Sequence, residues 1–177
     1  MKKVKILLSF ILLIPLASGC STKVYEHSLF WKKEGTIYNI QYADKAILIS
    51  DHVFRVELEQ DRSTKYIKTG NIADCLYQGL KESGEFGTYA ILKEQDKNML
   101  PPQAKVIRIV PKDVKLKNNI WKTSTIGVVT ATVIIDGVEK EIESEGKGAF
   151  LISKDALSKA CENFGKELKK TLNQEKK

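Results

Sequence analysis

Two alternating runs joined by an Asp-Gly dipeptide constrain the fold more than any other feature of the sequence. Residues 128–150 read VVTATVIIDGVEKEIESEGKGAF, with Asp136-Gly137 between two stretches in which apolar and polar residues alternate. A type I′ turn needs positive φ at both central positions, which an Asp-Gly pair tolerates, and a period of two is typical of a strand. The segment therefore predicts a β-hairpin and with it an antiparallel sheet.

The second arm of this hairpin carries a row of glutamates: Glu139, Glu141, Glu143 and Glu145. Paired carboxylates can hold a metal or perform acid–base chemistry, but glutamates of one parity lie about 7 Å apart and point the same way into solvent. Lysines on adjacent strands can neutralise them, and no histidine or buried environment is expected beside them. We interpret the row as a solvated face.

Other segments also have strand character. They are residues 36–42 and 45–50, which we expect to form a hairpin about Ala43-Asp44, then 52–60, 87–94, and 105–117 with a bend or a break at Pro111. Residues 97–104 contain two prolines, which lack the amide hydrogens of a sheet ladder, so this segment predicts a loop.

Two amphipathic helices complete the pattern. The first is expected from Ile72 to Gly84, after possible caps at residues 69–71, and the second follows Ser153, which can cap it. The second helix has an apolar stripe made of Leu157, Ala160, Cys161, Phe164, Leu168 and Leu172. Two such helices and one largely antiparallel sheet pack best with both helices on one face. The predicted fold class is α+β, a two-layer sandwich.

The N-terminus has the organisation of a secretory signal. Residues 1–5 carry three lysines, residues 6–16 are almost wholly apolar, and Ala17-Ser18-Gly19 supplies small side chains. The apolar run has about 11 residues, whereas a helix needs roughly 20 to cross a hydrocarbon core. We therefore predict a cleaved leader rather than a membrane span.

Cys20 directly follows the small residues, and LASGC resembles the lipobox of bacterial lipoproteins. The resemblance implies a diacylglyceryl group on the Cys20 thiol, cleavage before Cys20 and acylation, typically with palmitate, of the new amino terminus. Ala17 stands where that family most often has leucine. Ser21 follows, where an aspartate would favour inner-membrane retention, so the resemblance implies the periplasmic face of the outer membrane. The alternative is an ordinary secretory signal with a coincidental cysteine.

Cleavage would divide the 177 residues into a leader (1–19), a lipidated tether (20–35) and one α+β domain (36–177). The leader takes three of the 29 basic residues with it, so the formal charge falls from +7 to +4. Part of the tether is expected to dock on the domain, because it is too apolar for a pure linker at Val24, Tyr25, Leu29, Phe30 and Trp31. Nucleic-acid binding is not expected, since basic and aromatic residues do not interleave.

Cys75 and Cys161 lie on or beside the apolar stripes of the two predicted helices. An exported protein can keep a disulfide, and closing a loop of 86 residues would contribute about 4 to 5 kcal/mol in the chain-entropy estimate. The alternative is two buried thiols that pack as small apolar side chains. The sequence slightly favours the thiols and leaves the bridge open.

Motifs for catalysis are not found in the sequence. There is no G-x-S-x-G or C-x-x-C, residues 146–148 lack the spacing of a phosphate loop, and the two histidines, His27 and His52, belong to different predicted segments. We expect no metal site, no cofactor and no enzymatic activity.

From about Ile72 to the end, the order of elements, the hairpin with Gly148-Ala149-Phe150 and the closing helix SKDALSKACENFGKELKKTL resemble the YajG-like family of outer-membrane lipoproteins. Neither that family nor the auxiliary lipoproteins of envelope transport offers a catalytic motif to carry over. The expected function is a membrane-anchored, non-enzymatic binding or assembly module with an envelope protein or lipid as partner. The alternatives are an auxiliary lipoprotein of an envelope lipid-transport or secretion system, and an anchored periplasmic enzyme with an unrecognised site.

Overall fold

The computed structural model describes residues 23–31, 43–61, 64–119, 123–149 and 152–174. The strands in these ranges are β1 (Lys23–Ser28), β2 (Lys45–Ile49), β3 (Val53–Asp61), β4 (Thr64–Asn71), β5 (Ala90–Lys93), β6 (Lys105–Asn119), β7 (Ser124–Ile135) and β8 (Val138–Ala149). The helices are α1 (Ile72–Glu82), the 3-10 helix η2 (Glu94–Met99) and α2 (Ser153–Gln174).

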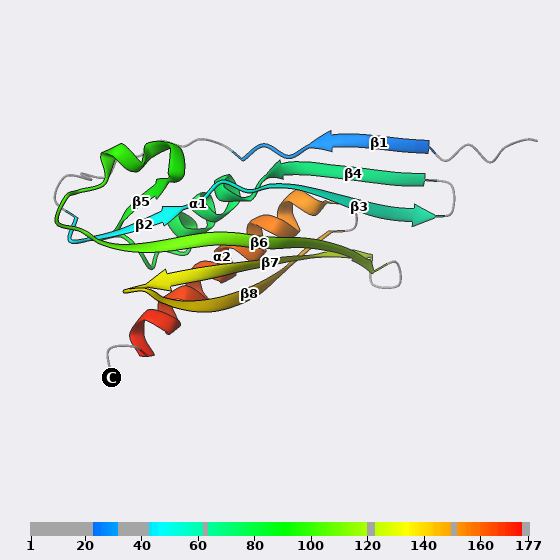
Figure 1. The fold of residues 1–177 in the computed structure, drawn as a ribbon. Coiled ribbons are helices and arrows are strands. Elements are labelled where there is room, and N and C mark those ends of the chain that lie inside the picture. The colour runs from blue at the N-terminus through cyan, green and yellow to red at the C-terminus, as the bar shows by residue number, and fades with distance from the viewer. Residues whose placement is uncertain (1–22, 32–42, 62–63, 120–122, 150–151, 175–177) are drawn as a thin grey trace, which may run out of the picture.

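The strands form two sheets, and both α-helices lie behind them (Figure 1). The larger sheet has the order β5-β2-β6-β7-β8, and the smaller has the order β1-β4-β3. The longest pairings, β6 with β7 and β7 with β8, are antiparallel. Helix α2 packs on β7 and β8, and α1 packs on α2. The predicted α+β class is confirmed, with two sheets in place of the expected single one.

The Asp-Gly hairpin forms as predicted. Asp136 and Gly137 have φ values of 49° and 84°, and the strands on either side pair from Ile135–Val138 to Ser124–Ala149. Positive φ at both positions is the requirement of a type I′ turn.

Strand β2 does not belong to the predicted hairpin about Ala43-Asp44. It pairs in parallel with β5 on one side and β6 on the other, and four of its five residues are buried. A continuous apolar run such as AILI, residues 46–49, is typical of a strand that is covered on both faces and has parallel neighbours. The other predicted arm, residues 36–42, lies outside the described residues.

Strand β6 is one long strand with an irregularity at Pro111. Its pairing with β7 shifts register between Pro111 and Asp113. Proline has no amide hydrogen to give to the ladder, so a bulge at this position is expected. Of the two alternatives left open by the sequence, a bend or a break at Pro111, the structure has one strand with a register shift.

The two helix starts differ from each other. The Asn71 side chain caps α1 by accepting from the Ala73 amide at 3.0 Å, and Gly84, with φ of 70°, follows the helix end. Ser153, by contrast, is the first residue of α2 and does not cap it. Its hydroxyl is buried and has no hydrogen-bond partner among the described residues.

Helix α2 lies unusually close to the sheet because glycines face it. A Cβ on Gly146 would overlap the backbone of Ala156 and Ala160, and one on Gly148 would lie 2.7 Å from the Ala156 amide nitrogen. Real side chains are not found so close to backbone atoms. The apolar stripe predicted for this helix is buried against the sheet throughout: Leu157, Ala160, Cys161, Phe164, Leu168 and Leu172.

Candidate functional site

The predicted lipidation residue, Cys20, lies outside the described residues, and the strand that follows it limits where a lipid can be. Strand β1 begins at Lys23, three residues later. Three residues of extended chain span at most about 11 Å. A lipid on Cys20 would therefore hold the start of β1 close to a membrane surface. None of the helices in the described ranges is long and apolar enough to cross a bilayer.

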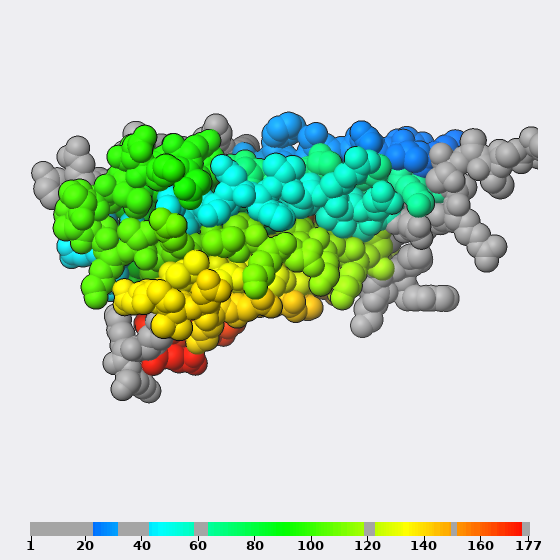
Figure 2. Space-filling model, viewed as in Figure 1, coloured from blue at the N-terminus to red at the C-terminus, as the bar shows by residue number. Residues whose placement is uncertain are grey.

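Strand β1 is an exposed edge. All six of its residues are exposed, and its main chain pairs in parallel with β4, from Lys23–Thr64 to Ser28–Thr69. Within the described residues no other strand pairs with β1. Figure 2 shows the strand in blue along the upper rim of the molecule. The sequence analysis assigns this segment to a tether, whereas the structure places it in the smaller sheet. An edge strand paired on one side can accept a further chain.

The residues after β1 attach this segment to the domain. Trp31 is 8% exposed, packs against Phe54 with ring centroids 6.3 Å apart, and donates from Nε1 to Ser158 Oγ of α2 at 3.1 Å. Leu29 also packs against the core, whereas Phe30 is 79% exposed. Part of the predicted tether is therefore anchored in the core, and the aromatic cluster is divided between core and surface.

One side of β1 and β4 carries aromatic and basic side chains together. Alternation along the strands places Lys23, Tyr25 and His27 of β1 on the same side as Tyr66 and Lys68 of β4. The Tyr66 ring stacks on that of Tyr25 at 5.2 Å and lies 6.2 Å from that of His27, and Lys68 Nζ is 5.9 Å from the Tyr66 ring centroid. We call these five residues the aromatic–lysine face.

The two sides of the smaller sheet carry different side chains. On the opposite side, Arg55 pairs with Glu26 at 3.5 Å and Lys65 pairs with Glu57 at 3.8 Å. On the side of the aromatic–lysine face, β3 carries Phe54 and Leu58, which are buried in the core.

Burial gives Lys68 a distinct electrostatic environment. Partial loss of water around its ammonium group lowers the pKa of Lys68 from its usual value. Neither Lys68 nor Lys23 has an ion-pair partner among the described residues. Chemically, this face is suited to anionic groups that approach from solvent and to flat or amphipathic groups that can lie on the tyrosine rings.

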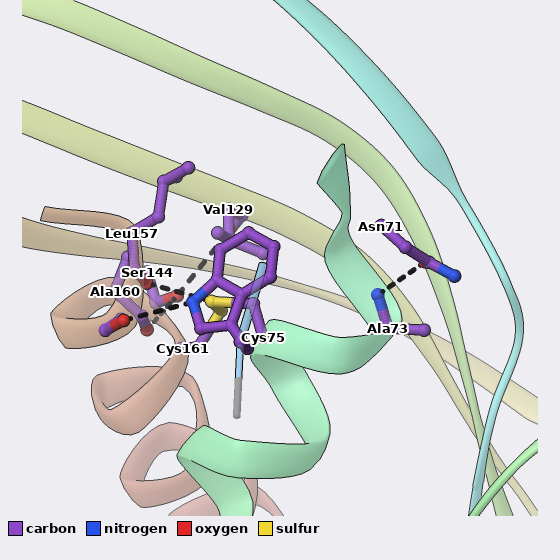
Figure 3. Close-up of a disulfide and its surroundings, with 10 residues drawn as sticks. Asn71, Ala73, Cys75, Val129, Ser144, Leu157, Ala160 and Cys161 are labelled. Carbon is purple, nitrogen blue, oxygen red and sulfur yellow. Dashed lines mark hydrogen bonds between the residues drawn. A yellow bond between two sulfur atoms is a disulfide. The ribbon is translucent and has the colours of Figure 1, made fainter. Parts of the chain in front are cut away.

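Cys75 of α1 and Cys161 of α2 form a disulfide with their Cα atoms 6.0 Å apart (Figure 3). Both residues are fully buried. Gly79 of α1 makes this approach possible, because a Cβ there would overlap the backbone of Cys161. Of the two alternatives from the sequence, the structure has the bridge. A reduced Cys75 would also have an acceptor, since the Leu157 carbonyl oxygen lies 3.3 Å from its sulfur.

The glutamate row of β8 lies in solvent, as the sequence predicts. Glu139, Glu141, Glu143 and Glu145 are all exposed. Lys112 Nζ contacts Glu141 Oε2 at 2.7 Å, and Thr130 Oγ1 donates to Glu143 Oε2 at 3.3 Å. One carboxylate of the row is thus paired with a lysine of β6, and another accepts a hydrogen bond from β7.

The two histidines have separate surroundings. His27 stacks near Tyr66, whereas His52 precedes β3 and its main chain bonds to Asn71 Oδ1 and to the Ile72 amide. In the described part of the chain, no three histidine, cysteine, aspartate or glutamate side chains are grouped as a metal site would need.

Sequence reasoning missed the aromatic–lysine face. Its signal is the alternation in KVYEHS (23–28) and TKYIKT (64–69), where aromatic and basic residues share one parity. The face becomes visible only once these two segments, about 40 residues apart in the chain, are known to be adjacent strands.

Comparison with known proteins gives no sequence family. No family model matches the chain, and no curated protein matches it. The predicted YajG-like membership therefore stays a prediction.

Solved structures show a distant similarity of fold. A crystal structure of an uncharacterized protein aligns over 89% of this chain and 100% of its own, with 8% identity and a TM-score of 0.42. Two structures of the PelC dodecamer from Paraburkholderia phytofirmans align over 72% of this chain and 86% of their own. Their identities are 15% and 14%, and their TM-scores are 0.36 and 0.37.

Proposed function

We propose that this chain is a lipoprotein of the bacterial envelope, acylated at Cys20, that serves as a non-enzymatic binding or assembly module. The leader, the small residues before Cys20 and the lipobox resemblance support the anchor. Ser21 supports the periplasmic face of the outer membrane as its location. Three acyl chains would make release from the membrane negligible, since each buried methylene contributes about 0.8 kcal/mol.

The observation that carries this proposal is the position of β1. An exposed strand, paired on one side only within the described residues, begins three residues after the proposed anchor. Its free main-chain groups and the 53% exposed side chain of Val24 are accessible to a partner in the same membrane. We therefore place the partner-binding region at this edge.

Site-specific photo-crosslinking in native envelopes tests the proposal. A photoreactive side chain at Val24 should give an adduct of one defined mass, which mass spectrometry identifies. The matched control is Val138, which is 64% exposed beside the Asp136-Gly137 turn. Adducts from both positions in equal yield, or none from Val24, would argue against a partner at β1.

A further inference from the structure

We propose that the partner at β1 is a second copy of this chain, whose own β1 pairs with it in antiparallel fashion about a two-fold axis. This inference rests on the proposed function, because it names the occupant of the edge that the proposal assigns to a partner. The two three-stranded sheets then join into one continuous sheet.

The first step is the direction of the main-chain groups of β1. The Leu29 amide donates to the Thr69 carbonyl oxygen of β4 at 2.7 Å, so Leu29 faces β4. In a parallel pair, the amide and the carbonyl of one residue point to the same side, and this direction alternates along the strand. Four residues have the opposite parity, and their amides and carbonyls point away from β4: Val24, Glu26, Ser28 and Phe30.

The second step is the accessibility of this edge. All six residues of β1 are exposed, its register with β4 is unbroken, and it contains no proline. Bulges and prolines are common features that keep an edge strand from pairing further. The β8 edge of the larger sheet differs, because Asn163 Nδ2 of α2 donates to the Glu145 carbonyl oxygen at 2.8 Å. Of these two edges, β1 is therefore the one better suited to receive a strand.

The third step is the register of the two strands. A two-fold axis at His27 places Val24 of each copy opposite Phe30 of the other. Val24 is 53% and Phe30 79% exposed, and a cross-strand pair of a β-branched and an aromatic side chain stabilises a sheet. An axis at Glu26 would place two carboxylates opposite each other, which is destabilising. An axis at Tyr25 would leave Phe30 beyond the end of the partner strand. The side chains therefore favour the axis at His27.

The fourth step is the membrane, which makes a second copy a suitable occupant. Only residues 24–30 of each copy take part, whereas a standard protein interface has about 20 to 30 residues on each side. Every copy carries the same edge beside the same proposed anchor, and confinement in one leaflet raises the effective concentration of the edges, as a tether does. The contact is therefore expected between anchored chains.

Cysteine crosslinking in native envelopes tests both the pairing and its register. Residues of a non-hydrogen-bonded antiparallel pair have Cα atoms about 4.5 Å apart, a separation that a disulfide spans. His27→Cys should therefore give a disulfide-linked dimer on oxidation. The chain has three cysteines of its own, of which Cys75 and Cys161 are bridged and Cys20 is acylated in the proposed form. Tyr25→Cys is the control, because the two copies of residue 25 would lie about 13 Å apart along the strands, too far for a disulfide.

A second substitution removes hydrogen bonds of the dimer and not those of the fold. The Ser28 amide points away from β4, so Ser28→Pro removes this donor without taking an amide from the β1–β4 ladder. In the His27→Cys chain it should lower the dimer yield about tenfold, because each copy loses one hydrogen bond. Ser28→Ala in the same chain should leave the yield unchanged. An undiminished yield with Ser28→Pro would overturn the pairing of the two edges.

The remaining outcomes separate this inference from the proposed function. Under the inference, the photo-adduct from Val24 has the mass of two mature chains. An adduct with a different protein, together with no dimer from His27→Cys, overturns the inference and leaves the proposed function standing. Equal dimer yields from His27→Cys and Tyr25→Cys overturn the register. A chain that does not fractionate with membranes overturns the proposed anchor, and the inference with it.

Discussion

At the residue scale, Gly146 shows how little space separates α2 from the sheet. A Cβ at this position would overlap the backbone of Ala156, Lys159 and Ala160. Backbone atoms of a helix cannot move aside as a flexible side chain can. Any side chain at residue 146 must therefore push α2 away from β8.

Gly146→Ala is expected to lower the free energy of unfolding by about 3 kcal/mol, because overpacking at a rigid contact strains both elements. Urea denaturation followed by circular dichroism measures this change. Gly87→Ala is the control, since an added Cβ there meets no atom within 4 Å. Equal stability of the two variants would contradict the close packing of α2.

Glu162 on α2 provides a pH-dependent test. Lys159 and Lys166 donate to it at 2.6 and 2.7 Å and hold the pKa of the Glu162 carboxyl below its usual value. Because the pKa of Glu162 is lower in the folded protein than in the unfolded chain, its two ion pairs stabilise the fold above the unfolded-state pKa. This stabilisation is lost as the pH falls through the folded-state pKa.

Glu162→Gln should therefore destabilise the protein at pH 7 by about 1 kcal/mol at most, since exposed helical pairs contribute about 0.5 kcal/mol each. At pH 3 the difference in stability between the variant and the unmodified protein should be smaller. Thermal unfolding at the two pH values measures it, with Glu139→Gln as a control outside these pairs. A deficit that is the same at both pH values would rule out the ion pairs as its source.

At the scale of elements, the features set by neighbouring residues could be predicted. Asn71 before α1, Gly84 after it and the Asp136-Gly137 turn each act within a few residues of their own position. The apolar stripe of α2 is also predictable, because the three- and four-residue spacing of its apolar side chains indicates which side of the helix is buried.

The elements that depend on distant partners could not be predicted. β1 has no buried residue to mark it as a strand, and it forms because β4 lies beside it. The predicted hairpin partner of β2 is wrong, because a short apolar run does not indicate which strands pair with it or whether they are parallel. For the same reason, the sequence indicates site residues only one at a time: Cys75 and Cys161, which the structure joins, and Cys20, whose lipidation stays a prediction.

The disulfide links α1 to α2 across a sequence separation of 86 residues. In the chain-entropy estimate, a loop of this length stabilises the fold by about 4 to 5 kcal/mol. Reduction should therefore lower the Tm by about 10 °C or more for a chain of this size. Thermal unfolding with and without a reductant measures the difference.

The double variant Cys75→Ala with Cys161→Ala is the control for this measurement, and its Tm should not respond to the reductant. An unmodified chain that also shows no response, and whose mass does not change on reduction, would have two thiols in place of the bridge.

At the scale of the whole molecule, the fold separates the end next to the proposed anchor from the opposite end. Strand β1 begins at one end of the molecule, whereas the turn between β7 and β8 and the end of α2 lie at the opposite end (Figure 1). With an acyl group on Cys20, as proposed, this arrangement would place the β1 edge beside the membrane and leave the opposite end away from it. Recognition by a membrane-bound partner is therefore expected near β1.

Mass spectrometry of the N-terminal peptide, from full-length protein purified out of bacterial membranes, tests this arrangement most directly. We predict that the mature chain begins at Cys20 and carries a diacylglyceryl group on the thiol and an acyl group on the amino terminus. A chain that retains Met1, or one that begins at Cys20 with an unmodified thiol, would contradict the proposed anchor.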